Sequence, residues 1–294
     1  MKKGLILVNA YTRQQSSLNQ SIRLKEELGK NGVDVDIKRN DCFIAQIDND
    51  GEILSNVKDY DFCIYLDKDK YVSLMLERSG LRLFNSHNAI QACDDKMQTA
   101  ILLSQNSIPM PRTLPGLLCY ENQKLNVKAI QNVGQILGFP VIIKSSYGSL
   151  GKDVYKANDI AELCEIAEKL KFSPHLFQQF IQESYGKDIR VIAIGGKVVA
   201  AMLRQSRGDF RSNLELGGEG KNIILSQEAK ELCEKVADLL DLDYCGIDIL
   251  QGNNKYYICE VNSNAFFGGI EAVTGINIAE KYASYICKKM YGKD

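Results

Sequence analysis

The sequence predicts an α/β protein, with a parallel sheet at the start of the chain and an α+β arrangement of antiparallel hairpins after it. Over residues 1–85, short apolar strand segments alternate with helical patterns, which is typical of a small parallel-sheet layer. Further along, hairpins are expected over residues 189–204, around Gly195-Gly196, and over residues 244–261, around the turn-forming letters QGNN. A chain of 294 residues has room for roughly two domains.

Composition and charge argue against several classes of function. The net charge is −1, and apolar and charged residues make up 45% and 25% of the chain, so no global charge recruits nucleic acid or an acidic membrane. No apolar stretch approaches the ~20 residues that a membrane span needs. The opening apolar run is too short for the apolar core of a signal peptide. We therefore expect a cytoplasmic protein.

Cysteine and histidine usage also limits the possible classes of function. The nine cysteines are widely spaced and form no CxxC pair, which favours reduced thiols that serve mostly as small core residues. His87 and His175 are the only histidines, which weakens a zinc site or a histidine-based nucleophile. A surface or capping role is the favoured interpretation of both.

The first part of the chain contains the predicted parallel-sheet layer. Its strands are expected at residues 4–9, 33–37, 61–66 and 81–85, with helices at 16–31 and 70–79. The segment lacks GxGxxG, so a dinucleotide-binding fold is not predicted. Ligands bind at the switch points of such sheets, so loops here can hold part of a substrate.

Two lysines stand out in the middle of the chain. Lys96 falls in the first half of a helix expected over residues 86–106, where a solvated lysine is the favoured interpretation from that segment alone. Lys144 ends a strand expected over residues 140–144, which follows a helix at 127–137. A return strand at 154–155 and a helix at 160–171 come after it.

The letters SSYGSLGKDV follow Lys144 directly. Gly148 and Gly151 allow such a loop to bring backbone N–H groups close to phosphate oxygens. A plain glycine turn is the alternative, and the segment is not a Walker loop because it lacks GK[ST].

Arginines cluster further along, after a strand expected over residues 175–181. Arg204, Arg207 and Arg211 lie within eight residues, and planar guanidinium groups suit phosphate or carboxylate. A solvated charge run is the alternative. A helix over residues 226–240 precedes the second hairpin, after which we expect a glycine-bearing loop and a closing helix over residues 278–290.

The second hairpin carries three oxygen donors among apolar neighbours. Glu260 and Asn262 are two residues apart and share a strand face, and Asp248 joins them if the hairpin register is even. Two carboxylates and an amide oxygen suit a hard cation such as Mg²⁺, with a nucleotide's phosphates completing its shell. The alternative is a half-buried strand pair with polar edge residues.

In this order, the features resemble the ATP-grasp superfamily, and within it the RimK-like carboxylate–amine ligases. The resemblance covers nearly the whole chain and is densest in GFPVIIKSSYGSLGKDV, GKDIRVIAIGGKVVAAMLRQSRGDFRSN, GIDIL, CEVNSN and GIEAVTGINIAE. It implies an N-terminal α/β pre-grasp domain and two grasp subdomains that clamp ATP between them. The expected boundaries are residues 1–88, 89–177 and 178–294.

The resemblance also implies roles for individual residues. Lys96 and Lys144 match lysines that touch ATP phosphates, and Ser149 and Gly151 belong to a mobile flap over the triphosphate. The nucleotide's base and ribose are matched by Gln178, Gln179, Phe180, Ile181 and Asp188. Arg211 and Asn213 match a segment on the nucleotide and substrate sides, Arg204 matches an arginine facing the reacting carboxylate, and Asp248, Glu260 and Asn262 match the Mg²⁺ ligands.

The implied activity is an ATP-dependent ligation of a carboxylate to an amine through an acylphosphate. Its cofactors are ATP and Mg²⁺, with Mn²⁺ as an alternative metal, and the acceptor is a protein terminus, a peptide or a metabolite. No nucleic-acid or membrane partner is expected, and a two-fold homo-oligomer is a base-rate expectation. Two departures from the family pattern are Gln179, where related ligases often carry glutamate, and AFFGGIE, where glutamate ligases tend to have a proline-glycine turn.

Two other readings stay open. One is a nucleotide-binding regulatory or scaffold protein that has lost turnover, although all the expected metal ligands and phosphate lysines are in the sequence. The other is a different ATP-grasp chemistry, such as phosphorylation or carboxylation, and no biotin-type lysine motif supports the latter.

Overall fold

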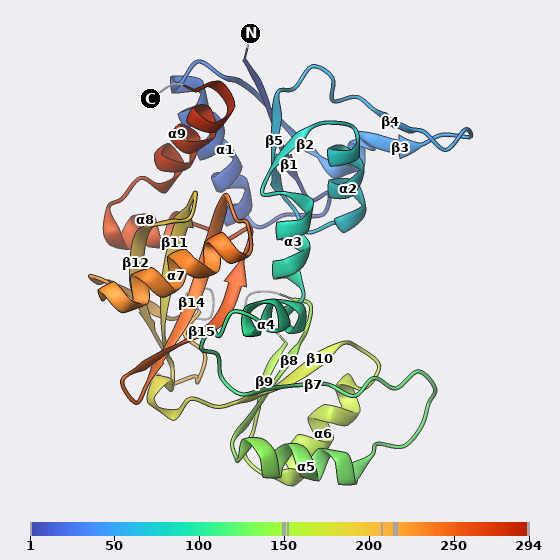
Figure 1. Cartoon of the computed structure of the whole chain (residues 1–294), viewed down its shortest axis with the longest axis vertical. Helices are drawn as coiled ribbons and strands as arrows, with labels where there is room; N and C mark the ends of the chain where they lie inside the picture. The colour runs from blue at the N-terminus through green and yellow to red at the C-terminus, as the bar shows by residue number, and fades with distance from the viewer. Residues whose placement is uncertain (1, 149–150, 152, 207, 214–216, 293–294) are drawn as a thin grey trace.

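The computed structural model describes residues 2–148, 151, 153–206, 208–213 and 217–292. Figure 1 shows the chain in three parts: a blue N-terminal layer at the top, a yellow-to-orange sheet below it, and a green part at the bottom. Within the described ranges, no helix is long and apolar enough to cross a membrane.

The N-terminal part is built on the four-stranded parallel sheet that the sequence predicts, and its strand order is β2-β1-β5-β6. Its elements are β1 (Lys3–Val8), α1 (Gln15–Lys30), β2 (Asp34–Arg39), the short helix η1 (Asn40–Cys42), β5 (Phe62–Leu66), α2 (Lys70–Arg78) and β6 (Arg82–Phe84). A two-stranded sheet of β3 (Ala45–Ile47) and β4 (Ile53–Ser55), which the sequence analysis does not predict, projects from this part (Figure 1).

The segment that leaves this part forms two helices, so the prediction of one helix over residues 86–106 is wrong. α3 (His87–Asp94) ends where Asp95 adopts an extended backbone, and α4 (Lys96–Ser104) begins directly after it. The Asp95 side chain accepts hydrogen bonds from the backbone N–H groups of Met97 and Gln98. A carboxylate that caps a new helix competes with continuation of the old one, which explains the break.

The middle part is a four-stranded antiparallel sheet with the order β7-β10-β8-β9. Its elements are β7 (Thr113–Pro115), α5 (Val127–Leu137), β8 (Val141–Ser145), β9 (Val154–Ala157), α6 (Ile160–Leu170) and β10 (His175–Gln179). Strand β10 is shorter than the predicted strand over residues 175–181, because the chain turns into the short helix η2 (Gln182–Ser184) directly after it.

The C-terminal part is a five-stranded antiparallel sheet with the order β13-β12-β11-β14-β15. Its elements are β11 (Lys187–Ile194), β12 (Lys197–Gln205), β13 (Glu219–Asn222), α7 (Gln227–Leu239), β14 (Tyr244–Gly252), β15 (Lys255–Asn262), α8 (Gly268–Thr274) and α9 (Ile278–Tyr291). Both predicted hairpins are present. The segment after β15 is not all loop as predicted, because α8 forms there and buries Ile270 in the core.

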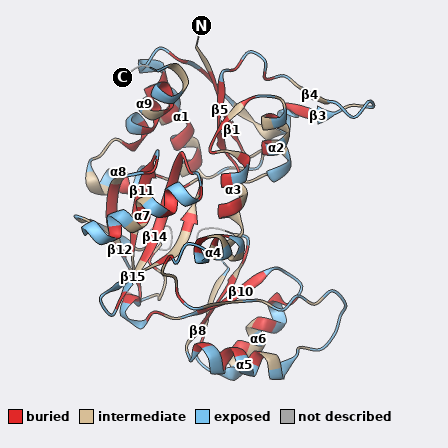
Figure 2. Ribbon diagram, in the orientation of Figure 1, coloured by how far each residue is buried: buried red, intermediate tan, exposed pale blue. Residues whose placement is uncertain are grey.

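Buried residues lie in all three parts of the chain (Figure 2), but the apolar ones form separate clusters. One apolar cluster joins β1 and α1 of the N-terminal part to β11, α8 and α9 of the C-terminal part. Asn85 adds hydrogen bonds across this junction, from its Nδ2 to the carbonyls of Tyr244 and Ser263. The middle part has a separate cluster built from α5, α6, β8 and Phe177. The middle part is therefore packed as a unit of its own, whereas the other two parts share a core.

Candidate functional site

Three oxygen-bearing side chains share one face of the β14–β15 hairpin. Asp248 lies directly opposite Glu260, and Gly246 lies directly opposite Asn262. Opposite residues in antiparallel strands point to the same side of the sheet, as do residues two apart on one strand. Asp248 therefore lies on the same face of the hairpin as Glu260 and Asn262, which the sequence alone left open. Their role as metal ligands stays a prediction.

A β-bulge sets this register. The turn residues Asn253 and Asn254 both have positive φ, 46° and 59°. Continued evenly from this two-residue turn, the pairing would set Asp248 opposite Cys259 and turn Glu260 to the other face. The register shift next to Asp248 moves the pairing by one residue, which brings the two carboxylates together.

Asp248 is buried, with 4% of its surface exposed, and two arginines bind it. Arg190 lies directly opposite on β11 and donates from Nε to Oδ1 at 2.5 Å and from Nη2 to Oδ2 at 2.8 Å. The Nη2 of Arg204, on β12, lies 3.0 Å from Oδ1. Burial alone would raise the pKa of Asp248, but attraction by both guanidinium groups outweighs burial and lowers this pKa.

Asp188 forms the other half of this buried network. Arg204 donates from Nε to its Oδ1 at 2.7 Å and from Nη2 to its Oδ2 at 2.5 Å. Burial, assisted by the nearby charge of Asp248, raises the pKa of Asp188 despite the attraction by Arg204. Asp188 is thus engaged by protein groups, and its predicted contact with a ribose stays a prediction.

Lys96 reaches toward the acidic face from the first residue of α4. Its Nζ donates to the carbonyl of Gly148 at 2.9 Å and lies 3.6 Å from Oε1 of Glu260. Lys144 is buried at the end of β8, and its Nζ lies 3.4 Å from Sγ of Cys259. Two lysines that are 48 positions apart in the sequence therefore lie beside neighbouring residues of β15. This convergence requires the middle and C-terminal sheets to face each other.

A narrow cavity of about 20 Å³ lies between these two sheets. Its lining includes Lys96, Lys144, Gln178, Cys259 and Glu260, so predicted nucleotide-binding residues from three elements meet there. Nε2 of Gln178 donates to Oγ1 of Thr113 at 3.0 Å. The cavity is too small for a nucleotide, so a nucleotide would fit there only if the two sheets separated.

The other residues predicted to meet the base lie around the connection after β10. Gln179 is exposed, and its backbone N–H donates to the carbonyl of Arg112. The ring of Phe180 meets Tyr185 edge to face and faces Nζ of Lys156 at 5.9 Å, whereas Ile181 is buried. Their contact with a base stays a prediction.

Arg211 connects the glycine loop to the arginine-rich segment. Its Nη1 donates to the carbonyl of Gly151 at 2.8 Å, and its Nη2 donates to Asp209 at 2.7 Å. The hydrogen bond from Arg211 lowers the pKa of Asp209. Ser149 and Arg207, which the sequence analysis singled out, lie outside the described residues.

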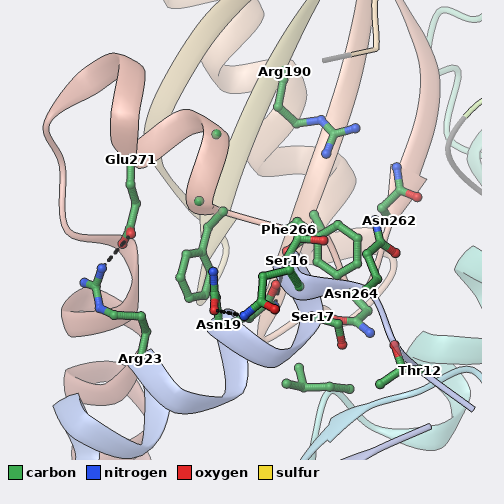
Figure 3. Close-up of a pocket in the computed structure, with 18 of the residues that line it drawn as sticks. Thr12, Ser16, Ser17, Asn19, Arg23, Arg190, Asn262, Asn264, Phe266 and Glu271 are labelled. Atoms are coloured by element: carbon green, nitrogen blue, oxygen red, sulfur yellow. Dashed lines mark hydrogen bonds and ion pairs between the residues drawn. The ribbon is translucent and has the colours of Figure 1, made fainter. Parts of the chain in front are cut away.

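A second cavity, of about 1050 Å³, opens between α1 and the C-terminal sheet. Figure 3 shows Arg190 and Asn262 at one end of it, and Arg23 paired with Glu271 at the other. Arg204, Asn213 and Glu260 also line it. The acidic face of β15 therefore borders both cavities, the narrow one through Glu260 and the wide one through Glu260 and Asn262.

Sequence reasoning missed Arg190 as a site residue. It lies two positions after Asp188 on β11, so the strand period puts both on one face, and that spacing was a usable signal. The contact between Arg190 and Asp248 was not predictable, because the β11–β14 pairing joins residues 58 positions apart. The α1 side of the wide cavity was missed as well, and its polar residues carry no distinctive spacing.

The donor set fits a hard cation. A carboxylate offers about four lone-pair directions, and the two arginines fill both on Oδ1 and one on Oδ2 of Asp248. With respect to the described residues, one direction of Oδ2 is left for a cation, together with the oxygens of Glu260 and the amide oxygen of Asn262. Over the described part of the chain, no group of three or more His, Cys, Asp or Glu side chains forms a metal-binding cluster. A cation here would therefore rely on Asn262 and on phosphate oxygens.

Two antiparallel subdomains that face each other across these lysines, preceded by a parallel sheet, define an ATP-grasp protein. The chain belongs to the RimK-like ATP-grasp family: the model of the RimK-like ATP-grasp domain matches residues 93–286. The predicted fold and the predicted family are thereby confirmed.

Relatives and structures agree with this assignment. The chain is 35% identical over 223 residues to beta-citrylglutamate synthase B of Danio rerio, covering 75% of this chain and 54% of that protein. It is 37% identical over 227 residues to a probable alpha-L-glutamate ligase of Psychromonas ingrahamii, covering 74% and 71%. The D-alanine–D-alanine ligase of Bacillus anthracis solved with ATP superposes with a TM-score of 0.75 at 18% identity, over 99% of this chain and 97% of that one. The chain spans about half the length of the synthase.

Proposed function

We propose that this protein is an ATP-dependent carboxylate–amine ligase that uses Mg²⁺ and forms an amide bond through an acylphosphate. One observation carries the proposal: Glu260 lines both the narrow cavity, where Lys96 lies 3.6 Å from its Oε1, and the wide cavity, which Asn262, Arg190 and Arg204 also line. The narrow cavity suits the nucleotide once the sheets part, and the wide one suits the two other substrates.

The chemistry needs charge neutralisation rather than a covalent enzyme intermediate. A carboxylate oxygen of the substrate attacks the γ-phosphorus of ATP, and the bond to the β–γ bridging oxygen breaks to release ADP. The amine nitrogen then attacks the acyl carbon, and the C–O bond breaks to release phosphate, while the amine loses a proton. Positioning and fixed positive charge supply the rate enhancement.

Each residue has a role that follows from its position. Lys96 and Lys144 would offset the charge of the phosphates, and release of Lys96 from Gly148 and Glu260 frees its ammonium for this. Glu260 and Asn262, with one oxygen of Asp248, would hold Mg²⁺. When bound, this cation would offset negative charge on the phosphate oxygens. The buried Arg190–Asp248–Arg204–Asp188 network keeps two guanidinium groups fixed at the edge of the wide cavity, where an acylphosphate would form.

The flap needs to cover this site during the reaction. An acylphosphate is hydrolysed by water, so the site has to close before the phosphoryl transfer. The bond from Arg211 to the carbonyl of Gly151 ties that residue of the glycine loop to the arginine-rich segment. Arg211 would at the same time approach the phosphates, which requires its pairing with Asp209 to weaken.

We infer that the amine substrate is an amino acid and place glutamate first among the candidates. The names of the relatives that the chain matches include a citrylglutamate synthase and an alpha-L-glutamate ligase. The carboxylate candidates are citrate, N-acetylaspartate, named in a 36% identical human relative, and peptides with a free carboxyl terminus. The segment AFFGG, which runs into the start of α8 and borders the wide cavity, is where this chain would differ in selectivity.

The test is ADP release in the presence of MgATP, each carboxylate and each amino acid. We expect one pair to raise ADP release far above the rate with ATP alone. We expect Glu260→Gln, which keeps the shape of the side chain, to lower turnover at least about 100-fold, on the scale of one lost charge-stabilising group. Gln227→Ala, an exposed change at the start of α7, is the control. Bound ATP with no stimulation by any pair would contradict the proposal.

A further inference from the structure

The wide cavity is bordered on one side by an uncapped helix start. Helix α1 begins at Gln15, its N-cap Gln14 makes no side-chain capping bond, and its first turn contains no acidic residue. The carbonyl of Gln14 accepts from the N–H groups of Ser17 and Leu18. Over the described ranges, the N–H groups of Gln15 and Ser16 have no protein acceptor, and both residues line the cavity. Such a helix start attracts negative charge.

Three buried oxygen atoms around the same cavity have no hydrogen-bond partner among the described residues: Ser16 Oγ, Gln20 Oε1 and Asn264 Oδ1. Gln20 is 97% buried, since 3% of its surface is exposed. Buried polar atoms in folded proteins almost always have partners. That all three orphaned atoms belong to side chains lining one cavity points to partners that a ligand supplies.

The chemistry of these atoms says what the ligand offers. Nε2 of Gln20 donates to the carbonyl of Ala265 at 3.4 Å, which leaves its amide oxygen as the orphan. Gln20 and Asn264 thus present two acceptors, which call for a donor such as an ammonium. Ser16, at the helix start, can instead donate its hydroxyl to an anion. Acceptors and an anion-attracting helix end therefore border one space.

This space adjoins the proposed reaction centre. Asn264 lies two residues beyond Asn262, and Figure 3 shows the two asparagines neighbouring each other, with Ser16 and Ser17 on the facing helix. The contact of Gln20 with Ala265 fixes α1 against the same segment. A group held by Gln20 and Asn264 would therefore lie in the same cavity as Arg190, Arg204 and Asn262, where the acylphosphate would form.

We propose that Ser16, Gln20 and Asn264, with the start of α1, form the subsite that binds the amine substrate as an α-amino acid. The ammonium donates to Gln20 and Asn264, and the α-carboxylate accepts from Ser16 and the free N–H groups of the helix. An α-amino acid carries its ammonium and its carboxylate on one carbon, and the two kinds of binding group border one cavity. The inference rests on the proposed ligase function and adds the class of its amine.

Two reactions on the intact protein separate the inference from the proposed function. With MgATP and the carboxylate panel, hydroxylamine traps an acylphosphate as a hydroxamate without needing the amino-acid subsite. Amide formation is then measured with L-glutamate, with L-isoglutamine, whose α-carboxylate is an amide, and with 4-aminobutyrate, which lacks it. We expect KM for the two analogues to exceed that for glutamate at least about tenfold, the scale of a lost hydrogen bond to a charged group.

Variants locate the subsite. Ser16→Ala, Gln20→Leu and Asn264→Leu are expected to raise KM for the amino acid at least about tenfold while the hydroxamate rate stays within about twofold. Lys25→Ala, on the exposed side of α1, is the control. Circular dichroism checks that each variant folds, and the comparison of amines on the unaltered protein does not depend on any variant.

The outcomes are distinct. Hydroxamate formation without discrimination between glutamate and its two analogues would overturn the subsite and leave the ligase function standing. Equal losses of hydroxamate and amide formation in the three variants would also overturn it, because the residues would then serve the carboxylate or the fold. If no carboxylate yields hydroxamate and no amide forms, the proposed function fails, and the subsite fails with it.

Discussion

Replacing Arg190 by methionine tests the buried network on which the site is built. Among the described residues, Arg190 supplies two of the three polar contacts to the carboxylate of Asp248, which is 4% exposed, and Arg204 supplies the third. Methionine keeps much of the side-chain volume but leaves the carboxylate with Arg204 alone, which Asp188 also engages. Removing one partner of a buried ion pair costs about 3–5 kcal/mol, and we expect about 3 kcal/mol because Arg204 still offsets part of the charge.

A double-mutant cycle in urea measures this contribution. Asp248→Asn relieves the uncompensated charge, so Arg190→Met with Asp248→Asn should lose less stability than the two single changes together, by at least about 1.5 kcal/mol. The transition is followed by circular dichroism at pH 7. Lys197→Met is the matched control on the same hairpin, because Lys197 pairs with Glu234 at the surface and its loss should cost much less stability than the loss of Arg190.

Two results would refute this reasoning. One is a cost of Arg190→Met no larger than that of Lys197→Met. The other is a coupling energy below about 0.5 kcal/mol, the value expected for independent sites. Either would mean that the arginine does not compensate the buried carboxylate.

Two further predictions concern elements that hold the site in place. A hydrogen bond from Lys30 is the main cause that lowers the pKa of Glu27 on α1, so its stabilisation is present above the unfolded pKa and is lost as the pH falls through the folded value. The free energy of unfolding is measured in urea at pH 7 and below about pH 4, for the unaltered protein and for Glu27→Gln. The loss of stability between the two pH values should be smaller in Glu27→Gln, and an equal loss in both proteins would contradict this. Asp95→Ala should cost about 1 kcal/mol and also weaken ATP binding, because Asp95 caps the helix that begins with Lys96. Asp159→Ala removes the equivalent cap of α6 and should cost as much stability without changing ATP affinity; equal affinity losses would count against the role of Lys96.

The local pattern of the chain was enough to predict most of the elements and their order. The alternation at the start of the chain predicted the parallel sheet, and Gly195-Gly196 predicted the first long hairpin, where both glycines have positive φ. The break at Asp95 was missed because an aspartate within an apolar period fits both a helix surface and a helix cap. Helix α8 was missed because Gly268 and Gly269 disfavour a helix, whereas burial of Ile270 against the core decides the outcome.

The site depended more on contacts between distant parts of the chain. The spacing of Glu260 and Asn262 predicted their shared face, but the side on which Asp248 lies depends on a bulge that the sequence does not signal. The pairing of Arg190 with Asp248 and the orphaned oxygens along α1 arise from the packing of separate sheets and helices. Residue types and short spacings cannot predict such contacts.

The most direct measurement of the central claim is a crystal structure with Mg²⁺ and a non-hydrolysable ATP analogue. We expect the middle and C-terminal sheets to separate and the analogue's phosphates to lie between the ammonium groups of Lys96 and Lys144. A cation should bridge those phosphates to Glu260 and Asn262 at about 2.1 Å. A nucleotide bound elsewhere, or a cation held without either side chain, would contradict the claim.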